Sequence, residues 1–291
     1  MNKQEIVHSF FHHRVGILAT MHQKEKVMMP LLERELGISV YIPNNFNTDC
    51  FGTFTRDVER PGSQLDAAKL KAEQALLLTK GTLAISSEGT FGPHPYVPFL
   101  PLNTEIVLLI DKENDWEIFG ESSTTDTNFN HKPIASVQEA IEFCESIGFP
   151  EHAVVVKLHE STKNQDEIIK GINNNQDLET AVHSLLGKSK SGNVWIETDM
   201  RAFCNPTRMK NIEKATQNLI EKIYNLCPTC SFPGFELVER RKGLPCEWCT
   251  LPTKLVKSEL YTCRKCGENE EKLYPNGKEK ADPSQCANCN P

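Results

Sequence analysis

Short apolar runs alternate with amphipathic stretches along the first 226 residues of the chain. The apolar runs predict strands at 15–19, 39–42, 83–85, 105–110, 116–120, 153–158 and 194–196. Apolar positions at helical spacing predict helices over 27–36, 63–76, 136–147, 166–186 and 206–223. Because strands and helices alternate, we expect an α/β domain with a mixed sheet flanked by helices.

Turn-forming residues follow the apolar run at 83–85. The glycines and prolines between 89 and 95 favour turns and cannot extend a central strand, so the sequence predicts that the strand gives way to a loop at Glu88. Ligands of α/β proteins bind beyond the carboxyl ends of strands. A carboxylate there can hold a metal ion or activate a water, and Glu88 is therefore a candidate catalytic residue. The alternative, a solvated loop carboxylate, stays open.

Two further candidates lie at the starts of predicted helices. The segment 20–24 joins the first strand to its helix, where backbone amides, Thr20 and Lys24 can bind phosphate. A plain loop with a solvated lysine explains the same residues. Asp66 can bind Mg²⁺ or act in catalysis, but it also lies three residues after Ser63, and this spacing is typical of a capping box.

Polar residues at another strand end form the next candidate group. Glu197 and Asp199 alternate, so both side chains point to one side and could join a metal site. Arg201 and Arg208 are candidates for binding an anionic substrate, and equally for pairing with these two acids. His94 lies between two prolines, so it is a rigidly placed candidate acid or base, or a polar surface residue.

Cysteine pairs dominate the chain from residue 227 onward, where regular periodicity is scarce. Eight cysteines form four C-x-x-C knuckles: Cys227, Cys230, Cys246, Cys249, Cys263, Cys266, Cys286 and Cys289. Two thiolates with two residues between them can bind one Zn²⁺, and a second knuckle completes a tetrahedral set of four sulfur ligands. Four sulfurs leave no open coordination position, so we expect two structural zinc ions that supply much of the folding energy of this segment. Consecutive knuckles are expected to pair, in preference to a crossed arrangement.

The bulk composition sets limits on the class of protein. A chain of 291 residues suits about two domains, which we place at 1–226 and at 227–291 as two zinc-ribbon-like modules. The net charge of −7 argues against broad, non-specific binding of nucleic acid. The sequence contains no membrane-length apolar run and no signal-peptide pattern, so we expect a cytoplasmic protein whose eleven cysteines are thiols or metal ligands.

The motif order in the first half resembles a known enzyme family. The motifs are Ala19-Thr20-x-x-x-Lys24 after a strand, Asp66-Ala67-Ala68-x-x-Lys71-Ala72 in a helix, Ser87-Glu88-Gly89, and a hairpin ending in Phe119-Gly120. Over residues 14–125 this order resembles the house-cleaning nucleoside triphosphate pyrophosphatases, with their inosine/xanthosine triphosphatase-like fold. The resemblance implies that Lys24 holds phosphate and that Asp66 and Glu88 bind Mg²⁺. The chain departs from that family in lacking its first-loop asparagine and in having Ser86 and Ser87 where paired aspartates are usual.

A second resemblance covers the whole chain. The segments Glu197-Thr198-Asp199-Met200-Arg201-Ala202 and Asn205-Pro206-Thr207-Arg208, together with the paired cysteine knuckles, are similar to an uncharacterised bacterial protein family. This resemblance implies no activity.

Two hypotheses of function follow from these observations. The first is a Mg²⁺-dependent hydrolase of phosphate anhydrides in nucleotides, in which metal neutralises charge on the phosphates and a carboxylate positions water. The second is a non-catalytic α/β scaffold whose zinc ribbons bind a protein or nucleic-acid partner.

Overall fold

The computed structural model describes residues 2–44, 46 and 62–290. It divides into two compact units, of which one is Phe11–Ile220 and the other combines the stretches before and after it. The protein is a mixed α/β protein with cysteine clusters in its C-terminal part, as the sequence predicts. Among the described residues, no helix has both the length and the apolar character needed to cross a membrane.

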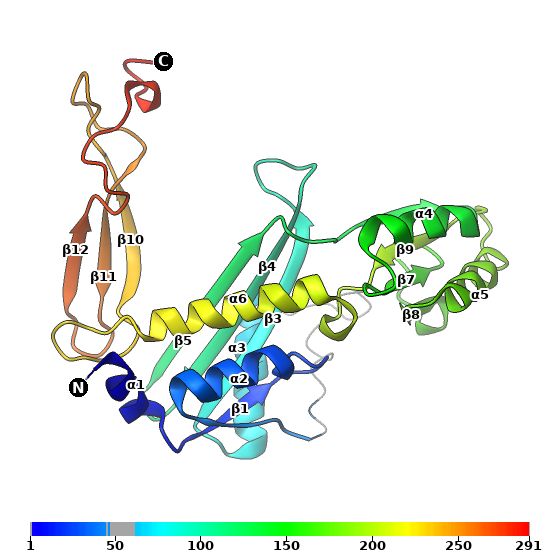
Figure 1. Ribbon diagram of the computed structural model, residues 1–291, viewed down its shortest axis with the longest axis horizontal. Coiled ribbons are helices and arrows are strands. Elements are labelled where there is room, and N and C mark those ends of the chain that lie inside the picture. Colours follow the sequence, from blue (N-terminus) through cyan, green and yellow to red (C-terminus); the bar gives the residue numbers. More distant parts are fainter. Residues whose placement is uncertain (1, 45, 47–61, 291) are drawn as a thin grey trace. The chain divides into compact units, whose positions relative to one another are not determined.

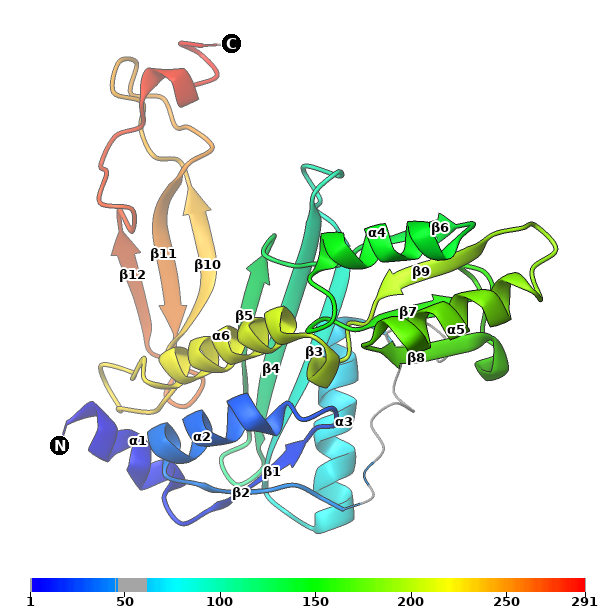
Figure 2. The same cartoon turned by 45° about the vertical axis from the view of Figure 1, so that its right-hand side comes forward.

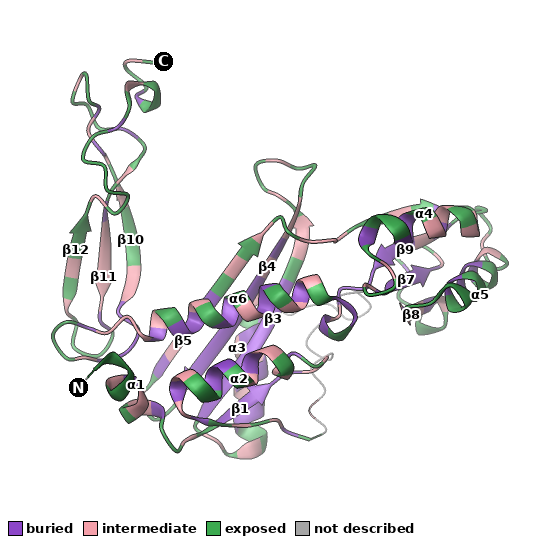
Figure 3. Cartoon of the chain, in the orientation of Figure 1, coloured by how far each residue is buried: buried purple, intermediate pink, exposed green. Residues whose placement is uncertain are grey.

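A five-stranded mixed sheet with the order β2-β1-β3-β4-β5 forms the first half of the larger unit. Its strands are β1 (Val15–Ala19), β2 (Ser39–Tyr41), β3 (Leu83–Pro93), β4 (Pro101–Asp111) and β5 (Trp116–Thr124). β1 pairs in parallel with β2 and β3, whereas β3, β4 and β5 form antiparallel pairs. Most of β1, β3 and β4 is buried (Figure 3).

Helices cover both faces of this sheet. Helix α2 (Glu25–Leu36) follows β1, α3 (Gln64–Thr79) precedes β3, and α6 (Pro206–Ile223) comes from much later in the chain. In Figure 1, α2 and α6 lie in front of the sheet and α3 lies behind it; Figure 2 shows the same arrangement from another side. The chain thus leaves β1 over one face and enters β3 from the other, which makes the carboxyl end of β1 a topological switch point.

The two helix faces are packed by different means. Small side chains of α3 (Ala68, Ala72 and Ala75) pack in one apolar cluster with Ala84 of β3 and with alternate residues of β1 and β4. Helix α6 approaches β5 closely at Gly120, where a Cβ atom would collide with the backbone of Leu219. Glycine at this position therefore lets the helix lie against the strand.

A four-stranded antiparallel sheet with the order β6-β9-β7-β8 follows in the same unit. Its strands are β6 (His131–Ile134), β7 (Val154–Lys157), β8 (Ile168–Ile172) and β9 (Val194–Thr198), and helices α4 (Val137–Ile147) and α5 (Asn175–Leu186) pack on it. The helical stretch predicted over 166–186, with interruptions at Gly171 and at the asparagines 173–175, is confirmed only in its second part. The segment Ile168–Ile172 is a strand, and Asn174 caps a new helix by accepting a hydrogen bond from the backbone of Asp177.

The smaller unit contains α1 (Lys3–Phe11) up to Phe10 and the cysteine-rich segment. Strands β10 (Glu236–Lys242), β11 (Val256–Thr262) and β12 (Asn269–Leu273) form an antiparallel sheet in that order. One cysteine cluster combines Cys227 and Cys230 with the knuckle that follows β11. The unit is therefore interleaved along the chain rather than built from two consecutive modules.

Candidate functional site

The sequence predicts that strand β3 ends at Glu88, and this prediction is wrong. The strand continues to Pro93 in register with β4. The glycines and prolines are accommodated because this part of β3 extends past its neighbour β1, whose last pair is Ala19 with Ser86. Ser87 is thus the first residue of β3 beyond the end of β1. Among the described residues, no strand pairs with this edge of β3 beyond Ser86. The end of β1 therefore defines the predicted ligand-binding edge of the sheet.

The loop that follows β1 brings a lysine to this edge. His22 and Gln23 have φ angles of 64° and 61°, and Lys24 then takes helical angles as the N-cap of α2. The Nζ atom of Lys24 lies 3.0 Å from Ser87 Oγ and 3.4 Å from the carbonyl oxygen of Ser87. Lys24 and Ser87 are both buried. Thr20, the other candidate in this loop, donates from its hydroxyl to the carbonyl of Met21.

Lys24 differs from the other buried cations at this end of the sheet because, in the described chain, its ammonium has no carboxylate within 4.0 Å. Burial lowers the pKa of Lys24 to about 7, and the nearby charges of Arg208 and Lys71 lower it further, against the opposing effect of Glu105 and Glu88. A substantial fraction of Lys24 is therefore neutral near pH 7, and it can accept a proton.

A buried ion pair lies beside Lys24 on the α6 face of the sheet. Arg208 Nε donates to Glu105 Oε1 at 2.8 Å, and its Nη1 donates to the carbonyl of Met200. Asn103 Nδ2 donates to the same carboxylate at 3.0 Å. A Cβ atom at Gly89 would lie 2.5 Å from both Arg208 Nη2 and Glu105 Oε1. Glycine is therefore required beside Glu88 to make room for this pair.

Glu88 lies on the opposite face of β3. Its carboxylate pairs with Lys71 of α3, and the neighbouring Ser86 on the same face donates from Oγ to the carbonyl of Ala68 at 2.7 Å. Side chains alternate along a strand, so Ser87 and Gly89 face Lys24 and Arg208 while Ser86 and Glu88 face α3. Lys24 and Glu88 both lie at the carboxyl end of β1, but on opposite faces of the sheet.

We name the five ionisable residues at this end of β1 the switch-point cluster: Lys24, Lys71, Glu88, Glu105 and Arg208. Each of them is buried, and together they contain three cationic groups against two carboxylates. With Lys24 protonated, the cluster therefore has an excess of positive charge in a region shielded from water. An anionic ligand would compensate this excess.

Two candidates from the first half have other roles in the structure. Asp66 is exposed and forms the capping box of α3: Oδ2 accepts from the backbone N–H of Ser63 at 2.9 Å and from its hydroxyl at 2.7 Å. These bonds with Ser63 hold the pKa of Asp66 below its ordinary value. His94 lies in the turn between β3 and β4, where Nδ1 accepts from the backbone of Tyr96 and Val97.

The acids of the second sheet also have cationic partners of their own. Lys157 Nζ lies 3.0 Å from Glu197, and Arg201 binds Asp199 with its closest approach at 2.6 Å. Asp199 additionally accepts from the backbone N–H of Gly171. The predicted salt bridge to Arg201 is thus present at Asp199. Arg208, the alternative partner, instead pairs with Glu105 of the first sheet.

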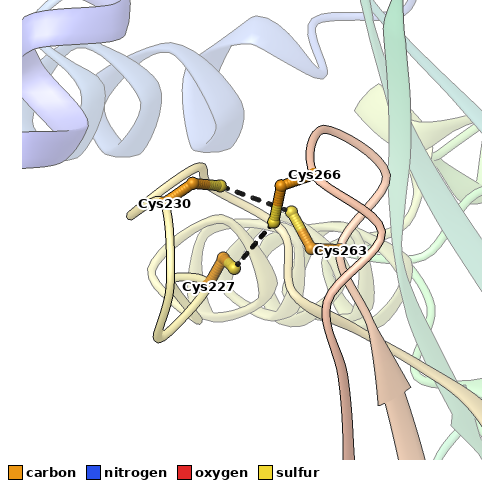
Figure 4. Close-up of side chains that lie close together, drawn as sticks. All are labelled: Cys227, Cys230, Cys263 and Cys266. Atoms are coloured by element: carbon orange, nitrogen blue, oxygen red, sulfur yellow. Dashed lines mark hydrogen bonds between the residues drawn. The ribbon is translucent and has the colours of Figure 1, made fainter.

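The cysteines form two metal-binding clusters. In the described part of the chain, the groups of three or more His, Cys, Asp or Glu side chains able to hold one ion are two cysteine quartets, and Asp66, Glu88, Glu197 and Asp199 belong to neither. The quartets are Cys227, Cys230, Cys263 and Cys266, shown in Figure 4, and Cys246, Cys249, Cys286 and Cys289. The expected pairing of consecutive knuckles is therefore wrong: the first knuckle pairs with the third and the second with the fourth.

The sulfur geometry fits zinc. The Sγ–Sγ distances are 3.7 Å for Cys227 and Cys266, 3.6 Å for Cys230 and Cys263, 3.8 Å for Cys246 and Cys289, and 3.6 Å for Cys249 and Cys286. Sulfurs in a tetrahedron around Zn²⁺ at about 2.3 Å are about 3.8 Å apart, whereas a disulfide requires about 2 Å. Two zinc ions thus fit the two quartets, with all four positions of each filled by protein.

Backbone amides prepare each quartet for a metal. Burial opposes ionisation of Cys227, but the N–H groups of Cys230 and Thr229 outweigh it and lower the pKa of that thiol to about 7. The N–H groups of Cys289 and Asn288 lower the pKa of Cys286 to about 7. Because the thiolate is the form that binds zinc, these backbone amides favour the ligating form of one cysteine in each quartet.

Three residues of the site were missed as candidates from the sequence. Glu105 appears there only as the start of a strand, and Lys71 and Ser87 appear only within a resemblance. Their role depends on pairings between distant segments, such as Glu105 with Arg208, 103 positions apart. A signal was present at Gly89, since a glycine inside a strand often marks the close approach of another group.

Comparison with known proteins places the chain in a family. A family model described as a domain of unknown function, DUF6671, matches residues 71–291. No curated protein matches the sequence.

Proposed function

The chain belongs to the DUF6671 family, and we propose that it is a metal-dependent hydrolase of phosphate anhydrides in nucleotides, with its active site at the switch-point cluster. The observation that carries the proposal is the position of Lys24. It is a buried amine at the carboxyl end of β1 that contacts a serine and, among the described residues, no carboxylate. Folds of this kind bind ligands at such a point.

The charge of the cluster supports a phosphate-bearing substrate. Arg208 and Lys71 are each already paired with one carboxylate, so among the described residues the Lys24 charge has no counter-ion of its own. A polyphosphate would provide it. Once Lys24 is protonated, its ammonium binds a phosphate oxygen, and Arg208 adds its positive charge from the α6 face.

Mg²⁺ would neutralise charge on the substrate phosphates. It is usually bound by one or two carboxylates plus the phosphates themselves, so a site with a single acidic side chain fits this chemistry. Glu88 is the candidate, because the phosphates would compete for the Lys71 ammonium that pairs with it. The resemblance of residues 14–125 to the house-cleaning pyrophosphatases supports the same roles for Lys24 and Glu88. Asp66, His94, Glu197 and Asp199 have no part in this proposal.

The proposal is tested with a panel of nucleoside triphosphates and Mg²⁺. The wild-type protein is compared with Glu88→Gln and with the matched control Glu197→Gln, which removes the charge of another acid paired with a buried lysine. We expect hydrolysis by the wild type and the control, and loss of at least tenfold in Glu88→Gln. A folded wild-type protein that is silent across the panel would overturn the proposal.

One observation favours the second function, a scaffold that binds a protein or nucleic-acid partner. Trp248 lies between two zinc ligands, Cys246 and Cys249, and its side chain is 75% exposed. A large apolar ring on a rigid knuckle is a suitable anchor for a partner. If binding of a partner is found and is lost in Trp248→Ala while both zinc ions remain, and the nucleotide panel is silent, the scaffold is the better account.

A further inference from the structure

We propose that Ser87 is the nucleophile of this site and that Lys24 is its general base, so that the reaction passes through a phosphoserine intermediate. The inference rests on the proposed function and specifies its mechanism. It replaces water by a side chain as the group that first attacks phosphorus.

The contact between the two side chains has the geometry of a nucleophile and its base. The distance of 3.0 Å from Lys24 Nζ to Ser87 Oγ allows direct transfer of the hydroxyl proton. Both groups are buried, so the hydrogen bond has little competition from water. In the described chain, Lys24 has no carboxylate partner that would hold its proton permanently. The lysine can thus be present as the free amine that a general base must be.

The adjacent serine provides a contrast within the same strand. Ser86 is equally buried, but its hydroxyl donates to the carbonyl of Ala68 on the α3 face. A carbonyl cannot take up the proton as a base. The chain therefore has two consecutive buried serines, and only Ser87 is in contact with a group that can activate it.

The chemistry balances with water as the co-reactant. Ser87 Oγ forms a bond to phosphorus, the bond from phosphorus to the bridging oxygen breaks, and the second phosphate leaves with the electron pair. The serine proton moves to Lys24 Nζ, and the ammonium so formed lies beside the phosphoryl group before it returns the proton to solvent. Water then attacks phosphorus, gives one proton to Lys24, and the Ser87–phosphorus bond breaks as Ser87 Oγ recovers a proton from Lys24.

The neighbouring cations can stabilise the charge that develops. Arg208 lies on the same face of β3 as Ser87, and the charges of Arg208 and Lys71 both act on Lys24. Positive groups fixed close to a phosphoryl group stabilise its transition state without reorganisation. They also favour the neutral form of Lys24, which is the form that the first step needs.

The test is a fluorophosphonate probe, whose phosphorus forms a stable bond to an activated serine with loss of fluoride. The full-length protein is incubated with the probe, and the labelled peptide is identified by mass spectrometry. We expect stoichiometric labelling of Ser87 in the wild type and in Ser86→Ala, and none in Ser87→Ala or Lys24→Met. Mapping the label in the wild type requires no variant to fold.

The outcomes separate the inference from the proposed function. Nucleotide hydrolysis by the wild type, with no label on Ser87 over a range of pH from 6 to about 9, would overturn the serine mechanism and leave the hydrolase in place. Labelling of Ser87 without nucleotide hydrolysis would support the nucleophile and reject the nucleotide as its substrate. Labelling at Ser86 equal to that at Ser87 would show non-specific reactivity and would also overturn the inference.

Discussion

The ammonium of Lys24 and the hydroxyl of Ser87, 63 positions apart in the chain, are 3.0 Å apart at the end of β1. This contact does not offset the free energy of desolvating the ammonium, because a neutral hydroxyl compensates a positive charge only weakly. Lys71 is equally buried but is paired with Glu88. We therefore expect the charge of Lys24 to destabilise the folded protein and the charge of Lys71 to stabilise it.

Replacing Lys24 by methionine is expected to stabilise the protein. The substitution keeps roughly the length of the side chain and removes a buried charge that has no carboxylate partner among the described residues. We therefore expect the free energy of unfolding at pH 7 to rise by about 1–4 kcal/mol. The matched variant Lys71→Met leaves Glu88 without its partner and should cost about 3–5 kcal/mol. Denaturant unfolding of both variants measures the two values. Equal destabilisation by both would show that Lys24 is an ordinary structural lysine.

The pH dependence of stability should report the same lysine. The pKa of Lys24 is about 7 in the folded protein and near its ordinary value of 10.5 in the unfolded chain. Between these values the unfolded chain binds more protons at this residue, so its contribution to stability increases with pH by about 1.4 kcal/mol for each unit. Denaturant unfolding at pH 7.5 and pH 9, taken as the difference between the wild type and Lys24→Met, isolates this contribution. A difference that does not change with pH would mean that the pKa of Lys24 is not lowered.

Gly89→Ala is expected to disturb the ion pair beneath it. The new methyl group would meet Arg208 and Glu105, so we expect a loss of about 1–3 kcal/mol of stability together with lower hydrolysis. Gly92→Ala, in the same strand, is the control, since nothing lies within 4 Å of its Cβ position. Similar effects of the two substitutions would indicate a general cost of alanine in this strand instead.

The crossed pairing of the cysteine knuckles is tested by metal content. We expect two zinc ions per wild-type chain. A variant with serine at Cys227, Cys230, Cys263 and Cys266 should retain one zinc ion, because it removes a single quartet. A variant with serine at Cys227, Cys230, Cys246 and Cys249 should lose both, because it takes two ligands from each quartet. If the second variant keeps one zinc ion, consecutive knuckles pair after all.

The sequence predicts most elements, because their signals are local. The hairpin of β4 and β5 and the capping box at Ser63 and Asp66 are examples that the structure confirms. The sequence predicts the end of β3 at Glu88 because glycines and prolines favour turns, whereas antiparallel pairing with β4 accommodates them and the strand continues to Pro93. The pairing of the knuckles was wrong because four identical spacings contain no information on which pairs approach in space.

The candidate site was predictable only in part. Lys24 could be identified from its place between a strand and a helix, and Glu88 from its place after a buried run. The face of the sheet on which Lys24 and Glu88 each lie depends on how side chains alternate along β3 and on where β1 ends. No local sequence pattern determines either of these. The sequence is equally compatible with metal binding and with an ion pair at Asp199, and the contact with Arg201 is the interaction present in the structure.

The most direct test is the value of kcat/KM for nucleoside triphosphate hydrolysis by the wild type and by Lys24→Met, with unfolding free energy measured on the same preparations. The account predicts that the variant loses at least about 100-fold in activity, the scale of a lost catalytic base, while its stability is equal or higher. Activity within about twofold of the wild type in this folded variant would contradict the account.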